Sequence, residues 1–345
     1  MSLGLLHALR KNFNRIGFIK PVGQRYLIEE GYKVDEDSVL INQVCGIECN
    51  LNDMSPIAVE KGFTEHYIRK PNRGKLTRRI KDSYSIVARN SDLVIIEGTG
   101  HAGVGSVFDL SNASVAKLLK SGVILVTEGG VGRPIDEIML NKALFDKEGV
   151  EVIGVIINKV IPDKYNKINK LIRIAFERNG IRVLGVIPYK SMLSTPSIEQ
   201  IKEEIGAEVL WGKEYLDNLA DNIIVAAMAP FDVLNYLKDR VLVITPGDRE
   251  DVITTILSSH LVGGKKDFDI IGIILTGGII PHKEVMRIIQ KTDIPVLYSK
   301  EDTYRVAARV HDRTIKIRPE DKEKIKMAVE LTEKYVDLDA IIKAL

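Results

Sequence analysis

The stretch Asp92-Leu-Val-Ile-Ile-Glu97-Gly98-Thr99-Gly100-His101 decides the fold class of this chain. Its four apolar residues, three of them β-branched, are typical of a strand buried on both faces of a parallel sheet. Ligands of open α/β sheets bind beyond the carboxyl ends of the strands. Glu97 can therefore reach a phosphate-bound Mg²⁺ while the backbone of Gly98 and Gly100 approaches the ligand closely. The alternative is a glutamate that caps the next helix or faces water.

Composition excludes several classes of protein. The chain has 345 residues, which favours two domains, and its net charge of +2 gives no reason to expect binding to nucleic acid or to an anionic membrane. No apolar run approaches the roughly 18 residues of a membrane span, and the N-terminus lacks the apolar core of a signal peptide. Cys45 and Cys49 have no second Cys/His pair with which to form a zinc site. Two cysteines fit a reducing compartment, so we expect a cytoplasmic protein.

Strands and helices alternate up to about residue 205. This alternation predicts right-handed crossovers and a parallel sheet with helices on both faces. Residues 50–75 look mostly irregular. The predicted strands are 16–19, 92–97, 123–126, 152–157 and 182–189, and the predicted helices are 2–11, 35–44, 76–90, 112–120 and 164–179.

Polar residues stand at the carboxyl ends of these strands. Lys20 ends the first strand, where it can meet a phosphate or remain a solvated surface lysine. Asn158 ends the strand at 152–157. Asp37 lies in an acidic first helical turn, an arrangement that the helix dipole alone explains.

The strand–helix pattern restarts near Ile205. Strands are predicted at 207–211, 222–227, 241–245, 270–275 and 295–298, and helices near 231–238, 250–259, 282–291, 301–309 and 319–334. A small sheet must cover its edges, and residues 336–345 carry a final apolar stripe, so we expect a homo-oligomer.

Two glycine turns of this second half follow buried strands. They should lie side by side at one sheet edge and form an anion-compatible pocket with Arg249 as its fixed charge. The alternative is that Arg249 pairs with a nearby acid, that Asp248 only caps a helix and that the glycines only make turns. The residues of this predicted pocket are Gly247, Asp248, Arg249, Thr276, Gly277 and Gly278.

Taken together, these segments resemble two known domains. The pieces GFIKPVGQ, DLVIIEGTG, GVILVTEGG, VIGVIINKV and VLGVIPYKSMLSTPSIEQI resemble the dethiobiotin-synthetase-like P-loop domain at the N-terminus of some phosphate acetyltransferases. The pieces VLVITPGDREDVI, GIILTGG and IPVLYSKEDTYRVAARV resemble the DRTGG domain. The resemblance implies a P-loop NTPase-like domain at 1–205, a DRTGG domain at 206–335 and a tail at 336–345.

The resemblance also implies roles for single residues. Lys20 would face the transferred phosphate, Asp37 and Glu97 would bind Mg²⁺, and Asn158 would read the nucleotide base, with ATP and Mg²⁺ as cofactors. A lysine, two carboxylates and a metal are the parts that phosphoryl transfer needs.

One departure from the family pattern leaves the function open. The phosphate loop G-x-x-x-x-G-K-[ST], which in the family precedes the helix that begins here at Ser2, is absent from this sequence. Either the start of the sequence is trimmed or misassigned, or the protein binds triphosphate in another way. Three hypotheses follow: a nucleotide-binding regulatory protein whose DRTGG domain senses a ligand or dimerises, an ATP-dependent ligase resembling dethiobiotin synthetase, and a scaffold without nucleotide chemistry. No acetyltransferase catalytic domain is present in the sequence.

Overall fold

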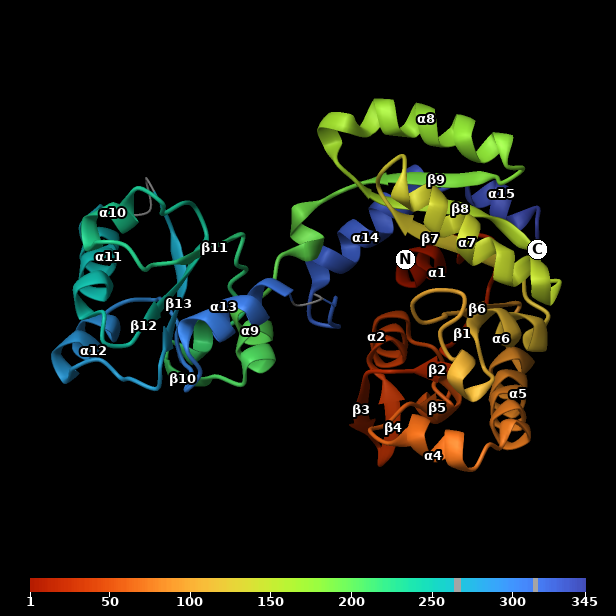
Figure 1. Ribbon diagram of the computed structural model, residues 1–345, viewed down its shortest axis with the longest axis horizontal. Helices are drawn as coiled ribbons and strands as arrows, with labels where there is room; N and C mark the ends of the chain where they lie inside the picture. Colours follow the sequence, from red (N-terminus) through yellow and green to blue (C-terminus); the bar gives the residue numbers. More distant parts are fainter. Residues whose placement is uncertain (264–267, 313–315) are drawn as a thin grey trace. The chain divides into compact units, whose positions relative to one another are not determined.

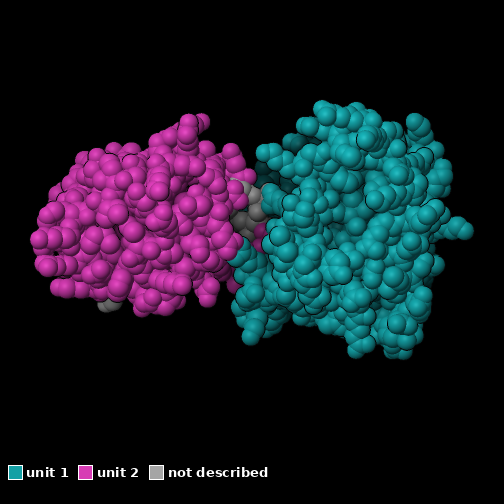
Figure 2. Space-filling view, turned by 90° about the horizontal axis from the view of Figure 1, so that it is seen from below, with its two compact units in different colours: residues 1–190, 317–345 teal, residues 191–316 magenta. Residues whose placement is uncertain are grey.

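The structure is a computed structural model that describes residues 1–263, 268–312 and 316–345 (Figure 1). Residues 1–190 and 317–345 form one unit, and residues 191–316 form another (Figure 2). The second unit is therefore inserted into the sequence of the first. Residues 264–267 and 313–315 fall within the predicted second domain and lie outside the described residues.

The first unit contains the expected parallel strands. The strand β1 (Ile16–Ile19) pairs with β6 (Leu93–Ile96), and β7 (Val123–Glu128), β8 (Val152–Val160) and β9 (Val183–Pro188) form a three-stranded sheet. All of these pairs are parallel. The predicted α/β fold class, with parallel sheets flanked by helices, is thus confirmed.

Helices cover these sheets because their apolar residues repeat with helical spacing. In α8, Ile168, Ile172 and Phe176 are four residues apart and all buried, which places them on one face of the helix. Helices of the first unit include α1 (Ser2–Leu9), α2 (Glu36–Cys45), α5 (Arg73–Arg89), α6 (Asn112–Leu119), α7 (Arg133–Glu148), α8 (Tyr165–Arg178), α14 (Lys322–Tyr335) and α15 (Leu338–Ile342).

The parallel sheet of the first unit is interrupted, which differs from the single sheet that the strand–helix alternation predicts. Among the described residues, β6 pairs only with β1, and β7 pairs only with β8. All four residues of β6 are half-buried, whereas all four of β1 are buried. In β7, Val126 is 47% exposed. One edge of β6 and one edge of β7 therefore have no neighbouring strand among the described residues, which leaves backbone groups there without a strand partner.

The segment that connects β1 with α5 is more regular than predicted. Residues 50–75, expected to be mostly irregular, contain α3 (Leu51–Met54), β5 (Ile57–Ala58) and α4 (Phe63–Arg69). Phe63 and Tyr67 of α4 contact the ring of Phe108 edge-on, which fixes this helix on the unit. An unpredicted hairpin, β3 (Tyr26–Glu29) and β4 (Tyr32–Asp35), follows the short strand β2 (Val22–Gly23), which pairs with β5.

The second unit is a five-stranded sheet in the order β10-β14-β13-β12-β11, with β10 antiparallel and the others parallel. Every residue of β13 is buried, as expected for a strand that is covered on both faces. The strands are β10 (Glu208–Trp211), β11 (Asn222–Val225), β12 (Val241–Pro246), β13 (Ile270–Thr276) and β14 (Val296–Tyr298). The helices are α9 (Ile198–Ile205), α10 (Pro230–Leu234), α11 (Glu250–Gly263), α12 (Lys283–Ile289) and α13 (Thr303–Asp312).

The two units have bounds that differ from the predicted domains at both ends. The helix α9, expected in the first domain, buries Ile198, Ile201 and Ile205 in the core of the second unit. The helices α14 and α15, expected in the second domain and its tail, belong to the first unit, where α14 packs against α1 and β9. Buried apolar side chains decide these boundaries, and the sequence pattern alone does not show which core they enter.

Candidate functional site

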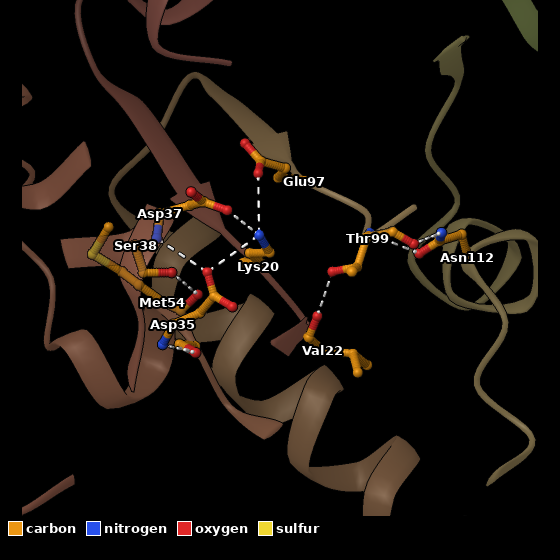
Figure 3. A network of polar contacts seen from close by, with 10 residues as sticks. Lys20, Val22, Asp35, Asp37, Ser38, Met54, Glu97, Thr99 and Asn112 are labelled. Atoms are coloured by element: carbon orange, nitrogen blue, oxygen red, sulfur yellow. Dashed lines mark hydrogen bonds and ion pairs between the residues drawn. The ribbon is translucent and has the colours of Figure 1, made fainter. Parts of the chain in front are cut away.

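Three of the predicted site residues meet at one point, where two carboxylates surround a buried lysine, Lys20 (Figure 3). The Nζ of Lys20 lies 3.3 Å from Oε1 of Glu97 and also pairs with Asp37. A third carboxylate, Asp35, lies 3.2 Å away and was not predicted. The Lys20 cluster, as we call these four residues, carries one positive charge and three carboxylates.

Strand ends and a helix start bring the Lys20 cluster together. Lys20 and Glu97 follow the paired strands β1 and β6, whose ends Ile19 and Ile96 are in register. Asp35 ends β4 and caps α2, since its Oδ1 accepts a hydrogen bond of 3.0 Å from the backbone N–H of Asp37. The backbone N–H of Lys20 donates to the carbonyl of Met54, which also accepts from the Ser38 hydroxyl.

The electrostatics of the Lys20 cluster keep the lysine charged. Burial lowers the pKa of Lys20, but Glu97, Asp37 and Asp35 outweigh this effect and raise the pKa well above its ordinary value. Burial raises the pKa of Glu97, Lys20 lowers it, and Asp37 adds repulsion, so that the net shift is upward. The Ser2 side chain and the amino group of Met1 also lower the pKa of Glu97, so the N-terminus of α1 lies near the Lys20 cluster.

The loop that follows Glu97 is held by Asn112, the first residue of α6. The Asn112 amide group donates to the carbonyls of Thr99 and His101, at 2.8 Å each, and its Oδ1 accepts from the N–H of Thr99. Gly98 is required here, because a Cβ at this position would lie 2.9 Å from Asn112 Oδ1. Gly100 has a φ of +65°, a conformation that other residues rarely adopt.

Asn158 lies outside the Lys20 cluster. It lies within β8, which continues to Val160, and it is in register with Glu128, the last residue of β7. Its Oδ1 accepts a hydrogen bond from the backbone N–H of Lys159. Lys159 in turn forms an ion pair of 2.7 Å with Glu128. The structure thus gathers Lys20, Asp37 and Glu97, and places Asn158 on the other sheet.

The Lys20 cluster suits a magnesium ion that arrives with a ligand better than a resident metal. Within the described ranges, no group of three His, Cys, Asp or Glu residues is arranged to hold a metal. However, Mg²⁺ is usually bound by one or two carboxylates together with substrate phosphates and water. Asp37 and Glu97 keep 22% and 25% of their side chains exposed, whereas Asp35 keeps only 1%, so Asp37 and Glu97 are the accessible pair.

The two glycine turns of the second unit lie side by side. Pro246 and Thr276 are in register, and a Cβ at Gly247 would lie 1.8 Å from the carbonyl oxygen of Ile279. The N–H groups of Gly247, Gly277 and Gly278 already donate to backbone carbonyls, at 2.8–3.1 Å. These donors are therefore engaged within the fold.

The side chains at these turns have partners of their own. Arg249 forms an ion pair of 3.0 Å with Asp251 and donates to the carbonyls of Ala227 and Met228, as in the alternative reading of the sequence. Thr276 shares a hydrogen bond of 2.7 Å with Thr303, and Asp248 is exposed. An anion at these turns would compete with existing contacts, so this pocket stays a prediction.

Sequence reasoning missed Asp35, Ser2 and Asn112. Asp35 belongs to the acidic run that precedes α2, and only the unpredicted hairpin shows that its side chain turns toward Lys20. Ser2 and Asn112 carry no spacing signal, since each meets its partner through tertiary packing.

Comparison with known families agrees with the two resemblances. A model of the AAA domain family matches residues 1–197, and a model of the DRTGG domain matches residues 200–312. No helix in the described part of the chain is both long and apolar enough to cross a membrane.

Several curated relatives are phosphate acetyltransferases. The chain is 29% identical to the phosphate acetyltransferase of Nitratidesulfovibrio vulgaris, with 97% of this chain and 48% of the relative covered. It is 28% identical to that of Synechocystis sp., with 99% and 49% covered. The chain thus spans about half the length of the curated relatives it matches.

A solved structure contains a DRTGG domain. It holds the CBS and DRTGG domains of the regulatory region of Clostridium perfringens pyrophosphatase in complex with the activator diadenosine tetraphosphate. It is 17% identical, covers 61% of this chain and 86% of its own, and superposes with a TM-score of 0.29, too low to support a shared arrangement.

Proposed function

The chain belongs to the AAA domain family, and from that membership we propose that its first unit, when joined to a phosphate loop, binds an adenine nucleotide with Mg²⁺ in a regulatory protein. The observation that carries this proposal is the Lys20 cluster at the carboxyl ends of two parallel strands. Ligands bind at such strand ends in α/β sheets, and the N-terminus of α1 adds backbone N–H groups that favour an anion.

The charge of the Lys20 cluster makes Mg²⁺ part of the proposal. Three carboxylates around one lysine leave a formal excess of two negative charges, which repels a bare triphosphate. In our proposal Asp37 and Glu97 hold Mg²⁺, which would supply charge neutralisation between the carboxylates and the phosphates. Lys20 would donate to a phosphate oxygen, and Asp35 would keep Lys20 in place.

The second unit is proposed as the sensing or dimerisation module. Its edge strand β11 leaves Ile223 and Val225 each 39% exposed, and an exposed apolar edge favours pairing with another chain. A closed homodimer is the commonest solution to such an edge. Cys45 and Cys49 are both free, which supports a reducing cytoplasm as the location.

A ligase is the second candidate. A lysine that contacts a transferred phosphate must carry a positive charge, and Lys20 is buried but stays charged. The two functions differ in turnover. The chain extended by an N-terminal strand and phosphate loop should bind Mg·ATP in calorimetry without releasing ADP if it is regulatory. ADP release that depends on an added carboxylic acid or amine would favour the ligase instead. If this version did not bind Mg·ATP, both the regulatory and the ligase function would be overturned, and the scaffold hypothesis would remain.

A further inference from the structure

A cavity of about 480 Å³ lies in the first unit between α1, α2 and α14. None of the residues that line it belongs to the Lys20 cluster. Its volume falls within the range of roughly 300–1,000 Å³ that is typical of small-molecule sites. We call it the three-helix cavity.

One wall of the three-helix cavity is apolar. Ile325 and Val329 are four residues apart on α14 and therefore lie on the same face of that helix, and Val44 of α2 also lines the space. All three side chains are half-buried. They offer an apolar surface that the fold itself leaves incompletely covered.

Two lysines also line the three-helix cavity. Lys322 and Lys326 are one turn apart on α14, are exposed, and form no ion pair with any residue in the described ranges. Like charges at this spacing repel, and positive charges are disfavoured in the first turns of a helix. An anion bound between the two lysines would relieve this repulsion. Glu330, which lies one further turn along α14, also lines the cavity and carries a negative charge.

His7 contributes a polar group from α1. It lines the three-helix cavity, and its Nε2 is buried with no hydrogen-bond partner among the described residues. A buried polar atom without a partner opposes folding, so a polar atom of a ligand at this nitrogen would contribute to affinity.

We propose that the three-helix cavity binds a small organic anion, with its acidic group between Lys322 and Lys326 and its apolar body against Val44, Ile325 and Val329. The walls of the cavity come from α1 and from α14, and α14 follows the inserted unit in the chain. The bound ligand would therefore stabilise the packing of α14 against α1.

Two fluorescent probes with the same type of apolar body test the proposal on the full chain. The anion 8-anilino-1-naphthalenesulfonate should bind saturably, and the uncharged N-phenyl-1-naphthylamine should bind at least tenfold more weakly. The double variant Lys322→Gln/Lys326→Gln should weaken binding of the anion at least tenfold. The matched variant Lys167→Gln/Lys170→Gln removes the same charge from exposed positions of α8 and should leave affinity unchanged.

Val44→Phe, which fills the cavity, should weaken both probes and provides a second readout. Circular dichroism should first show that each variant retains the fold. The proposal is overturned if the anion fails to saturate, if the uncharged probe binds equally well, or if the two double variants have the same affinity. It is also overturned if Val44→Phe leaves the binding of both probes unchanged.

Discussion

The Nζ of Lys20 lies 3.2 Å from Oδ1 of Asp35, and these two side chains are only 6% and 1% exposed. Burial of a charge is costly, and such a lysine persists only when its partners compensate for the lost hydration. Asp35 also begins α2 through its cap on Asp37. One carboxylate therefore sets both the start of a helix and the position of the lysine at the proposed nucleotide site.

Replacement of Lys20 by Met should strongly destabilise the first unit. It would leave three carboxylates at one partly buried point, and loss of one partner of a buried ion pair costs about 3–5 kcal/mol. Lys11→Met is the matched control, since Lys11 pairs with Glu333 at the surface, where an ion pair contributes about 0–1 kcal/mol. Calorimetric unfolding of both variants provides the comparison. Equal, small losses would mean that Lys20 is not held as a buried charge.

Replacement of Glu97 by Gln should change the pH dependence of stability. Burial raises the pKa of Glu97 above its ordinary value of 4.5, so the native state holds this proton more tightly than the unfolded state. Glu97 therefore makes its full contribution to stability below pH 4.5 and loses it as the pH rises through the raised pKa. The stability of Glu97→Gln relative to the original chain should rise from pH 4.5 to pH 7 in urea unfolding. A constant difference across that interval would contradict the raised pKa.

Much of this site was accessible from the sequence, because Lys20 and Glu97 each follow an apolar strand, and parallel strands bring their ends to one edge. The site role of Asp37 came only from the family resemblance, because the helix dipole alone explains an acidic residue in a first helical turn. Asp35 was not accessible from the sequence, since the burial patterns of β3 and β4 lack the alternation of a half-buried strand, and the apolar residues Leu27 and Ile28 are both exposed. Its turn, Glu30-Gly31, has two positive φ values, a hairpin geometry for which Gly is only part of the signal.

The boundaries of the units show a second limit of the sequence. The apolar spacing of α14 correctly predicts a helix, but it does not specify which core receives Leu331. A helix can pack against a segment that is distant in the sequence when tertiary contacts favour it. Here α14 packs against α1, which lies more than three hundred residues earlier in the chain.

Replacement of Gly247 by Ala should destabilise the second unit more than replacement of Gly277. At Gly247 a Cβ would lie 1.8 Å from the carbonyl oxygen of Ile279, so the two turns would have to separate. Overpacking of this kind costs about 1–3 kcal/mol or more. At Gly277 the only loss of stability would come from the φ of +79°, a conformation that costs a residue other than Gly about 1–2 kcal/mol. The single tryptophan, Trp211, lies in the second unit, so its fluorescence during urea unfolding can report on that unit. The reverse order would mean that the turns are not in contact.

The open edges of β6 and β7 bear on nucleotide binding. A phosphate loop supplies several backbone N–H donors and a lysine aimed at the β- and γ-phosphates. Each charge-assisted hydrogen bond is worth about 1.5–3 kcal/mol. The Ser2 side chain and the amino group of Met1 lower the pKa of Glu97, so the N-terminus of α1, where such a loop would join this helix, lies near the Lys20 cluster. A strand that precedes the loop could form hydrogen bonds with the unpaired backbone groups of β6 and β7.

We therefore expect the 345-residue chain to bind Mg·ATP weakly or not at all, and a version extended by an N-terminal strand and phosphate loop to bind it. Loss of three or four charge-assisted hydrogen bonds is enough to turn micromolar affinity into no measurable binding. Titration calorimetry of both versions, with and without Mg²⁺, is the measurement, and Glu97→Gln in the extended version should remove the dependence on Mg²⁺. Low-micromolar binding by the 345-residue chain would refute the argument. Equal failure of both versions would favour the scaffold, because the Lys20 cluster would then serve only to join α2, β1 and β6.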